Sequence, residues 1–118
     1  MMDKRVMLGL VEKVVLIGDN GSSKELVGRI DTGATVSSID LDLANKMNLK
    51  RIDKFKIVKS ASGIEKRPLV IAKIKVGGQM IEEKFNLADR SHMTYQVLIG
   101  QNILKKGDFL VDPKKEGQ

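Results

Sequence analysis

The chain has 118 residues, of which 42% are hydrophobic, 31% charged and 3% aromatic, with a net charge of +6 and no cysteine. This composition is typical of a folded domain, so it excludes a disordered chain, a disulfide scaffold and thiolate chemistry. The length predicts a single domain over residues 1–118, with residues 114–118 as a frayed tail. No apolar run approaches the roughly 18 residues of a membrane helix and no signal peptide is recognisable, so we expect a cytoplasmic protein without membrane contact.

The first part of the chain predicts a β-hairpin followed by a strand and a helix. Residues 11–18 and 25–30 are rich in apolar and β-branched side chains, and the Asn20-Gly21 pair between them is a strong turn signal. Residues 37–49 mix apolar residues with Asp40 and Asp42, which predicts a short strand that leads into one short helix.

Further short strands are predicted over residues 55–60, 68–78, 79–89, 94–100 and 109–112. Residues 61–67 are expected to form a loop, Gly77-Gly78 a turn, and residues 101–106 one or two helical turns. Strands at intervals of about ten residues predict a mainly β fold, either a barrel or a sandwich.

A carboxylate in a tight glycine turn is the first candidate for chemistry. Asp31 directly follows a predicted strand, within the segment GRIDTGATVSS. The Asp-Thr-Gly tripeptide alone is common and also fits a purely structural turn. Its setting adds weight, because an apolar run that ends in glycine precedes a predicted helix much later in the chain: Val97, Leu98, Ile99 and Gly100.

These segments resemble the retropepsin-type aspartic proteases, the half-size relatives of pepsin. In that family a strand is followed by Asp-Thr/Ser-Gly-Ala, a mobile hairpin called the flap, and an apolar run with glycine before a helix. The matching pieces here are IDTGAT, residues 59–68 and VLIGQNIL. The resemblance implies a closed acid-protease barrel with one short C-terminal helix, active as a symmetric homodimer. The flap tip would be Ser60, Ala61, Ser62 and Gly63.

A narrower resemblance covers most of the chain. RIDTGATVSS, KRP (66–68), MTYQVLIG (93–100) and FLVDP (109–113) follow the layout of a bacterial and archaeal family that carries the older label "ATP-dependent zinc protease". Its members often accompany ATP-grasp ligases that add glutamate tails to proteins. Gln101 departs from the arginine expected there, which leaves any ion pair of that arginine in question but not the fold.

No cofactor or metal is expected, despite that label. The chain has one histidine, His92, and no cysteine, so it lacks a ligand set for zinc. It also lacks the glycine-rich Lys-Ser/Thr loop that would cradle the phosphates of ATP.

Aspartic protease chemistry needs two carboxylates that share one proton, because two like charges about 3 Å apart do not both ionise. The chain supplies one Asp-Thr-Gly, so we expect a homodimer in which Asp31 of each copy meets on the two-fold axis. Gly33 would donate its N–H to the carboxylate, and the family implies that Thr32 bonds across to the partner loop. Ala34 lacks the hydroxyl of a serine at that position, so we expect activity at mildly acidic to neutral pH.

The positive charge predicts a peptide or protein substrate that is acidic, steered by candidates such as Arg29, Lys59, Lys66 and Arg67. One alternative is a non-catalytic dimerisation or regulatory module of the same fold that binds a protein partner. Nucleic-acid binding rests on charge alone, and the near absence of aromatic residues argues against a stacking platform for single strands.

Overall fold

The computed structural model describes residues 4–116, apart from the side chain of Ser60. In this range the chain forms nine strands and two short helices. Their order is β1 (Val6–Leu8), β2 (Val11–Ile17), β3 (Ser23–Ile30), β4 (Ser37–Asp40), α1 (Leu41–Lys46), β5 (Lys50–Ser60), β6 (Gly63–Val76), β7 (Gln79–Ala88), β8 (Val97–Ile99), α2 (Gln101–Lys106) and β9 (Phe109–Val111). Neither helix is long and apolar enough to cross a membrane.

Six strands close into a barrel in the order β2-β3-β8-β4-β7-β6, and a pairing of β2 with β6 completes the ring. The β3–β8 and β4–β7 pairs are parallel, whereas the remaining neighbours in the ring are antiparallel. The predicted mainly β barrel with a short C-terminal helix is therefore confirmed. The predicted strand-to-helix passage after residue 37 is also present, as β4 and α1, and Asp40 caps that helix through the Leu43 N–H.

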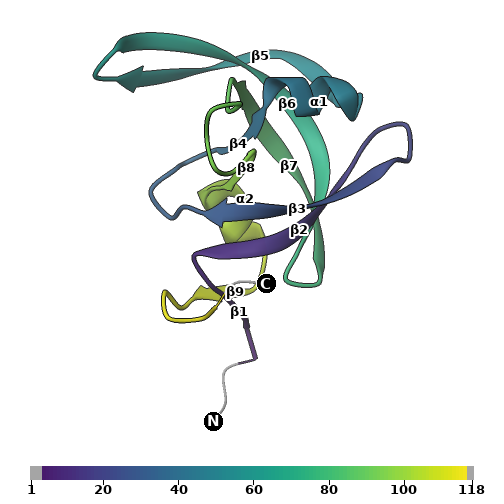
Figure 1. Cartoon of the computed structure of the whole chain (residues 1–118), viewed down its shortest axis with the longest axis vertical. Coiled ribbons are helices and arrows are strands. Elements are labelled where there is room, and N and C mark those ends of the chain that lie inside the picture. The colour runs from purple at the N-terminus through teal and green to yellow at the C-terminus, as the bar shows by residue number, and fades with distance from the viewer. Residues whose placement is uncertain (1–3, 117–118) are drawn as a thin grey trace.

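The long strand β6 belongs to two structures at once. Its second half lies in the barrel, while its first half pairs with β5 as a hairpin that projects from the barrel (Figure 1). The hairpin ladder is irregular between Ile52 and Phe55, opposite Pro68. Proline has no N–H to give to a ladder, so it is accommodated at such a break.

The predicted loop over residues 61–67 is wrong. The ladder runs to the Ser60–Gly63 pair, so only Ala61 and Ser62 form the turn. Gly63 has a φ of 125°, a conformation that side-chain-bearing residues rarely adopt, and this permits the short connection. Most of the surface of a projecting hairpin is exposed to solvent, so its strands lack the apolar alternation of a barrel strand. The polar residues after Gly63 therefore suggested a loop.

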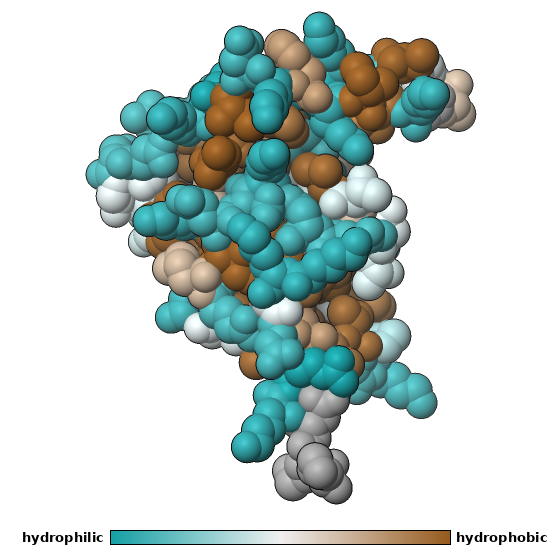
Figure 2. All heavy atoms as spheres, turned by 180° about the vertical axis from the view of Figure 1, so that it is seen from behind, coloured by the Kyte–Doolittle hydropathy of each residue, from teal (hydrophilic) through white to brown (hydrophobic). Residues whose placement is uncertain are grey.

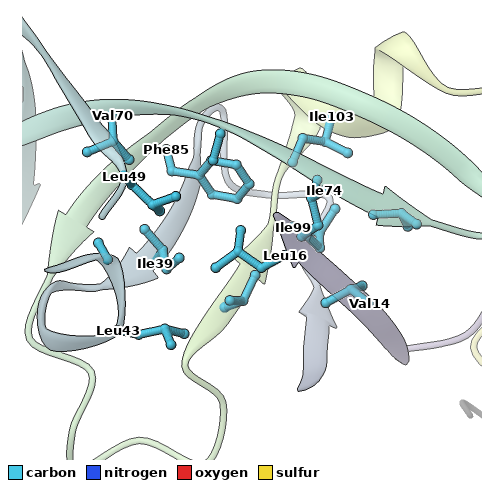
Figure 3. Packing of buried hydrophobic residues seen from close by; sticks show 14 of the residues in the cluster. Val14, Leu16, Ile39, Leu43, Leu49, Val70, Ile74, Phe85, Ile99 and Ile103 are labelled. Atoms are coloured by element: carbon cyan, nitrogen blue, oxygen red, sulfur yellow. The ribbon is translucent and has the colours of Figure 1, made fainter. Parts of the chain in front are cut away.

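The barrel interior is a single apolar core. Side chains from β2, β4, β6, β7, β8 and α2 point into it, with Phe85 in the midst of them (Figure 3). In the second half of β6, Val70, Ala72, Ile74 and Val76 are buried while the lysines between them face solvent, as the alternation predicted. Each fully buried large apolar side chain contributes about 1.5–3 kcal/mol to stability.

The two ends of the described chain meet in a small separate sheet. β1 pairs with β9 in parallel, with Val6 opposite Phe109. Sequence analysis predicted β9 but not β1. Lys115 lies in the predicted tail, and its ammonium bonds to the Met7 carbonyl (2.8 Å) and to the buried carboxylate of Glu12 (3.0 Å). The last residues of that tail, 117–118, lie outside the described residues.

Candidate active site

Asp31 stands at the end of β3, at one mouth of the barrel. β3 runs parallel to β8, with Ile30 opposite Ile99, and the Asp31 N–H donates to the Ile99 carbonyl at 2.9 Å. The preceding N–H, that of Ile30, donates to the Leu10 carbonyl, also at 2.9 Å. The backbone before the carboxylate is thus fixed from both sides, whereas the side chain remains partly exposed.

The turn after Asp31 folds back onto its own carboxylate. The Gly33 N–H donates to Asp31 Oδ1 at 2.9 Å, as predicted from the missing side chain of glycine. The Ala34 N–H faces the Asp31 carbonyl at 3.3 Å. Thr32 and Gly33 are exposed in the single chain. The carboxylate is therefore oriented by backbone while its outer side is open.

Gly100 lies directly beneath this loop. A Cβ at this position would lie 2.8 Å from the Ala34 carbonyl oxygen, 3.0 Å from the Val36 carbonyl carbon and 3.1 Å from the Ser37 nitrogen. These are all backbone atoms, so only glycine permits the crossing at this separation. The predicted supporting residues Val97, Leu98 and Ile99 form β8, which pairs with both β3 and β4.

A partly buried polar network joins the loop to α2, and it was not predicted from the sequence. The Oδ1 atom of Asn102 accepts from both the backbone N–H (2.9 Å) and the hydroxyl (2.8 Å) of Ser37, and its Nδ2 donates to the Lys84 carbonyl (2.8 Å). The Ser37 hydroxyl in turn accepts from the Gly100 N–H at 2.8 Å. The available signal was an amide residue two positions after the glycine of VLIG.

Gln101 binds the active-site loop directly. Its side-chain amide donates to the Thr32 carbonyl at 2.8 Å, and its backbone N–H donates to the Ala34 carbonyl at 2.7 Å. The residue that departs from the expected arginine therefore holds the loop through neutral hydrogen bonds.

A cleft of about 310 Å³ opens beside the loop. It is lined by residues 33–36 of that loop and by residues 56–59 of the projecting hairpin. Ser38, Asn86 and Leu98 also line it. The cleft therefore extends from the residues next to Asp31 to the projecting hairpin.

Four cations line this cleft, and among the described lining residues none is acidic: Lys56, Lys59, Arg67 and Arg90. Sequence analysis named Lys59 and Arg67 but missed Lys56 and Arg90. Its other two candidates lie elsewhere, since Arg29 is exposed on β3 and the Lys66 ammonium stacks over the Phe55 ring at 4.4 Å. The available signal for Arg90 was an arginine that directly follows the strand predicted over residues 79–89.

Arg90 is buried, with an exposed fraction of 8%. Its Nε donates to the Tyr95 carbonyl at 2.9 Å, and its backbone N–H donates to Asp40 Oδ1 at 2.8 Å. Burial and the neighbouring charge of Arg67 lower the pKa of the Arg90 guanidinium, whereas the carboxylates of Asp40 and Asp31 act in the opposite direction.

The described residues of the predicted flap tip do not line the cleft. The hairpin contributes Lys56–Lys59, and the tip residues Ala61, Ser62 and Gly63 extend beyond them, with the Ser60 side chain outside the described part. The hairpin also carries exposed apolar side chains, among them Phe55, Ile57 and Ile64. Figure 2 shows this apolar surface on the projecting hairpin, at the upper right of the view.

The barrel, the Asp31 turn and the overhanging hairpin together have the retropepsin fold. The EIAV protease in complex with the inhibitor HBY-793 aligns with a TM-score of 0.60 and 21% identity over 89% of each chain. The simian foamy virus protease aligns with a TM-score of 0.58 and 15% identity over 80% of this chain and 91% of that one. At these identities the likeness shows the fold.

Residues 41–117 match the family described as "RimB-like: Retropepsin-like aspartic endopeptidase RimB", and the chain belongs to this family. The matched region begins after the Asp31 turn. A protein of unknown function from Legionella pneumophila, Lpg0085, is similar over 95% of this chain and 96% of its own, with 26% identity and a TM-score of 0.67. No curated protein matches the chain.

Proposed function

We propose that the chain is a homodimeric aspartic endopeptidase in which two copies of Asp31 form the catalytic pair. The observation that carries this proposal is the Asp31 carboxylate itself. It is held by the Gly33 N–H, and Gly33 itself lines the cleft, in which no described lining residue is acidic. The site in one chain is half of the pair that the reaction needs.

The proposed reaction is general acid–base hydrolysis of a peptide bond. The ionised Asp31 takes a proton from the water held between the pair, and the hydroxyl oxygen bonds to the carbonyl carbon. The protonated Asp31 of the second copy gives its proton to the carbonyl oxygen. The first Asp31 then gives the proton that it took from water to the amide nitrogen, and a hydroxyl of the tetrahedral carbon returns a proton to the second Asp31. The C–N bond breaks, and an acid and an amine leave.

A second copy would also cover apolar surface beside Asp31. Leu10 is 53% exposed, and its carbonyl bonds to the residue directly before Asp31. Thr32, on the loop that follows Asp31, is also exposed, so its hydroxyl is available to the loop of a partner copy. Burial of such apolar side chains favours association, so this face is the one we assign to the dimer contact.

The substrate class we propose is acidic peptides, including glutamate-tailed proteins in the cytoplasm. The support is the charge of the cleft, which collects four cations without a lining carboxylate among the described residues. A cleft lined by one sign of charge raises the local concentration of ligands of the opposite sign.

The test is mass-spectrometric cleavage of a peptide mixture that contains oligoglutamate-tailed peptides, from about pH 4 to about pH 8. We expect cleavage by the wild type and none by Asp31→Asn, with both proteins folded and dimeric. Cleavage that persists in Asp31→Asn would contradict the mechanism. A folded dimer that cleaves no peptide would instead favour the non-catalytic module of the same fold.

A further inference from the structure

We propose that Arg67 and Arg90, with Asn86, form a subsite that binds a side-chain carboxylate of the substrate close to the cleaved bond. This inference rests on the proposed peptidase function and names the group of the substrate that the cleft would bind. It assigns selectivity to two particular residues rather than to the general positive charge of the chain.

The hairpin places two cations against each other. Arg67 on β6 is the cross-strand partner of Lys56 on β5, and both line the cleft. Side chains of directly opposite residues lie on the same face of a strand pair, where like charges destabilise the pairing. An anion bound between them would remove that repulsion.

The Arg67 guanidinium is only partly satisfied by the protein. Its NH1 lies 3.3 Å from Asn86 Oδ1 and its NH2 lies 3.2 Å from Glu65 Oε2. Its Nε is buried and has no hydrogen-bond partner among the described residues. The Glu65 side chain is 56% exposed, and a solvent-exposed ion pair of that kind is weak. Glu65 is therefore a weak competitor for a substrate carboxylate.

The second guanidinium of the proposed subsite is that of Arg90, which also lines the cleft. Arg90 is fixed through its Nε and its backbone N–H, by the Tyr95 carbonyl and the Asp40 carboxylate. Within residues 4–116, its two terminal nitrogens have no hydrogen-bond acceptor. Burial and the charge of Arg67 oppose the protonation of Arg90, as the lowered pKa indicates. A rigid buried cation with free donors is suited to bind an anion.

This concentration of charge is local. A larger hollow of about 450 Å³ on the barrel is lined by two acidic and two basic residues, Asp19, Glu82, Lys50 and Lys73. The net positive charge of the chain therefore does not make every hollow basic. The excess of basic over acidic lining residues is found in the cleft that includes Gly33. A substrate side chain that enters there belongs to a residue near the cleaved bond.

The experiment compares Arg67→Gln with Arg51→Gln. Arg51 is an exposed arginine on β5 that does not line the cleft, so both variants lose the same charge. The substrates are end-blocked peptides that share one sequence and differ only in carrying Glu or Gln on either side of the same central bond. Blocked ends leave the side chain as the source of the carboxylate. Binding of the same peptides to Asp31→Asn, with and without Arg67→Gln, is measured by fluorescence anisotropy.

We expect the wild type and Arg51→Gln to prefer Glu over Gln peptides by at least about tenfold in kcat/KM, the range for hydrogen bonds to a charged group. In Arg67→Gln the ratio of kcat/KM for the Glu peptide to that for the Gln peptide should fall toward one, because kcat/KM for the Glu peptide decreases. A ratio that stays at the wild-type value while cleavage still depends on Asp31 would overturn the subsite alone. Arg67-dependent binding of the Glu peptide without any cleavage would support the subsite and overturn the peptidase function.

Discussion

Gly100 shows how one residue determines the geometry of the site. A methyl group there would meet three backbone atoms of the active-site loop at 2.8–3.1 Å, so the loop itself would have to shift. We expect Gly100→Ala to lose about 1–3 kcal/mol of unfolding free energy, the usual cost of overpacking, and most of the cleavage activity. Urea denaturation and peptide cleavage measure the two effects.

The control is Gly28→Ala on β3. A Cβ there would make ordinary contacts of 3.5–3.6 Å with side chains of Ile99 and Val14. This variant should stay within about 1 kcal/mol of the wild type. If the two alanine variants behaved alike, the close crossing at Gly100 would not be what holds the loop.

At the scale of single residues, the motif was readable from the sequence but its support was not. Asp31, Gly33 and Gly100 stand in a recognisable local pattern, whereas the bond between Ser37 and Asn102 joins residues that only the closed barrel brings together. The same holds for Arg90, whose position beside Arg67 depends on β7 and β6 being neighbours. Side-chain partners far apart in sequence leave little local signal.

At the scale of elements, α2 is attached to β7 by the pair of Glu83 and Lys106, whose charged atoms lie 3.1 Å apart. Burial raises the pKa of Glu83, but the hydrogen bond from the Lys84 N–H and the Lys106 ammonium outweigh it, so the pKa lies below its ordinary value. A lowered pKa in the folded state contributes stability above the ordinary glutamate value. That contribution is lost as the pH falls through the folded-state value.

We therefore expect Glu83→Gln to be less stable than the wild type by about 0.5–1 kcal/mol at pH 7, with the difference vanishing in acid. Denaturation at a series of pH values measures this. Glu25→Gln, on an exposed position of β3, serves as the control and should show no such trend. A deficit for Glu83→Gln that stayed constant down to acidic pH would show that packing, not the ion pair, holds the helix.

The elements themselves were largely predictable where one face is buried. The alternation along the second half of β6 and the Asn20-Gly21 turn each led to the right structure. The hairpin was not predicted at its full length, because Glu65, Lys66 and Arg67 carry no apolar period. β1 was missed since its three residues are stabilised by pairing with β9 at the other end of the chain.

At the scale of the whole molecule, the proposed catalytic pair of Asp31 carboxylates requires a dimer. Leu10 lies beside the Asp31 strand end and is exposed in the single chain. We expect Leu10→Asp to raise the protein concentration needed for half-maximal activity by more than about tenfold, since charge at the core of a contact is costly. Analytical ultracentrifugation should show monomers with an unchanged circular dichroism spectrum.

Val27→Asp is the matched change at an exposed apolar position on β3, where 42% of the residue is accessible. It should leave both the dimer and the activity close to those of the wild type. Dissociation of both variants, or of neither, would move the dimer contact away from the face that includes Leu10.

The central claim, that each chain holds half of the catalytic pair, is tested most directly by mixing subunits. Wild type and Asp31→Asn are combined in equal amounts, allowed to exchange, and assayed for peptide cleavage. If only dimers with two Asp31 carboxylates cleave, activity per wild-type chain should fall to about half, and further with excess variant. Activity per wild-type chain that does not change with added variant would mean that one chain is a complete site, and would contradict the account.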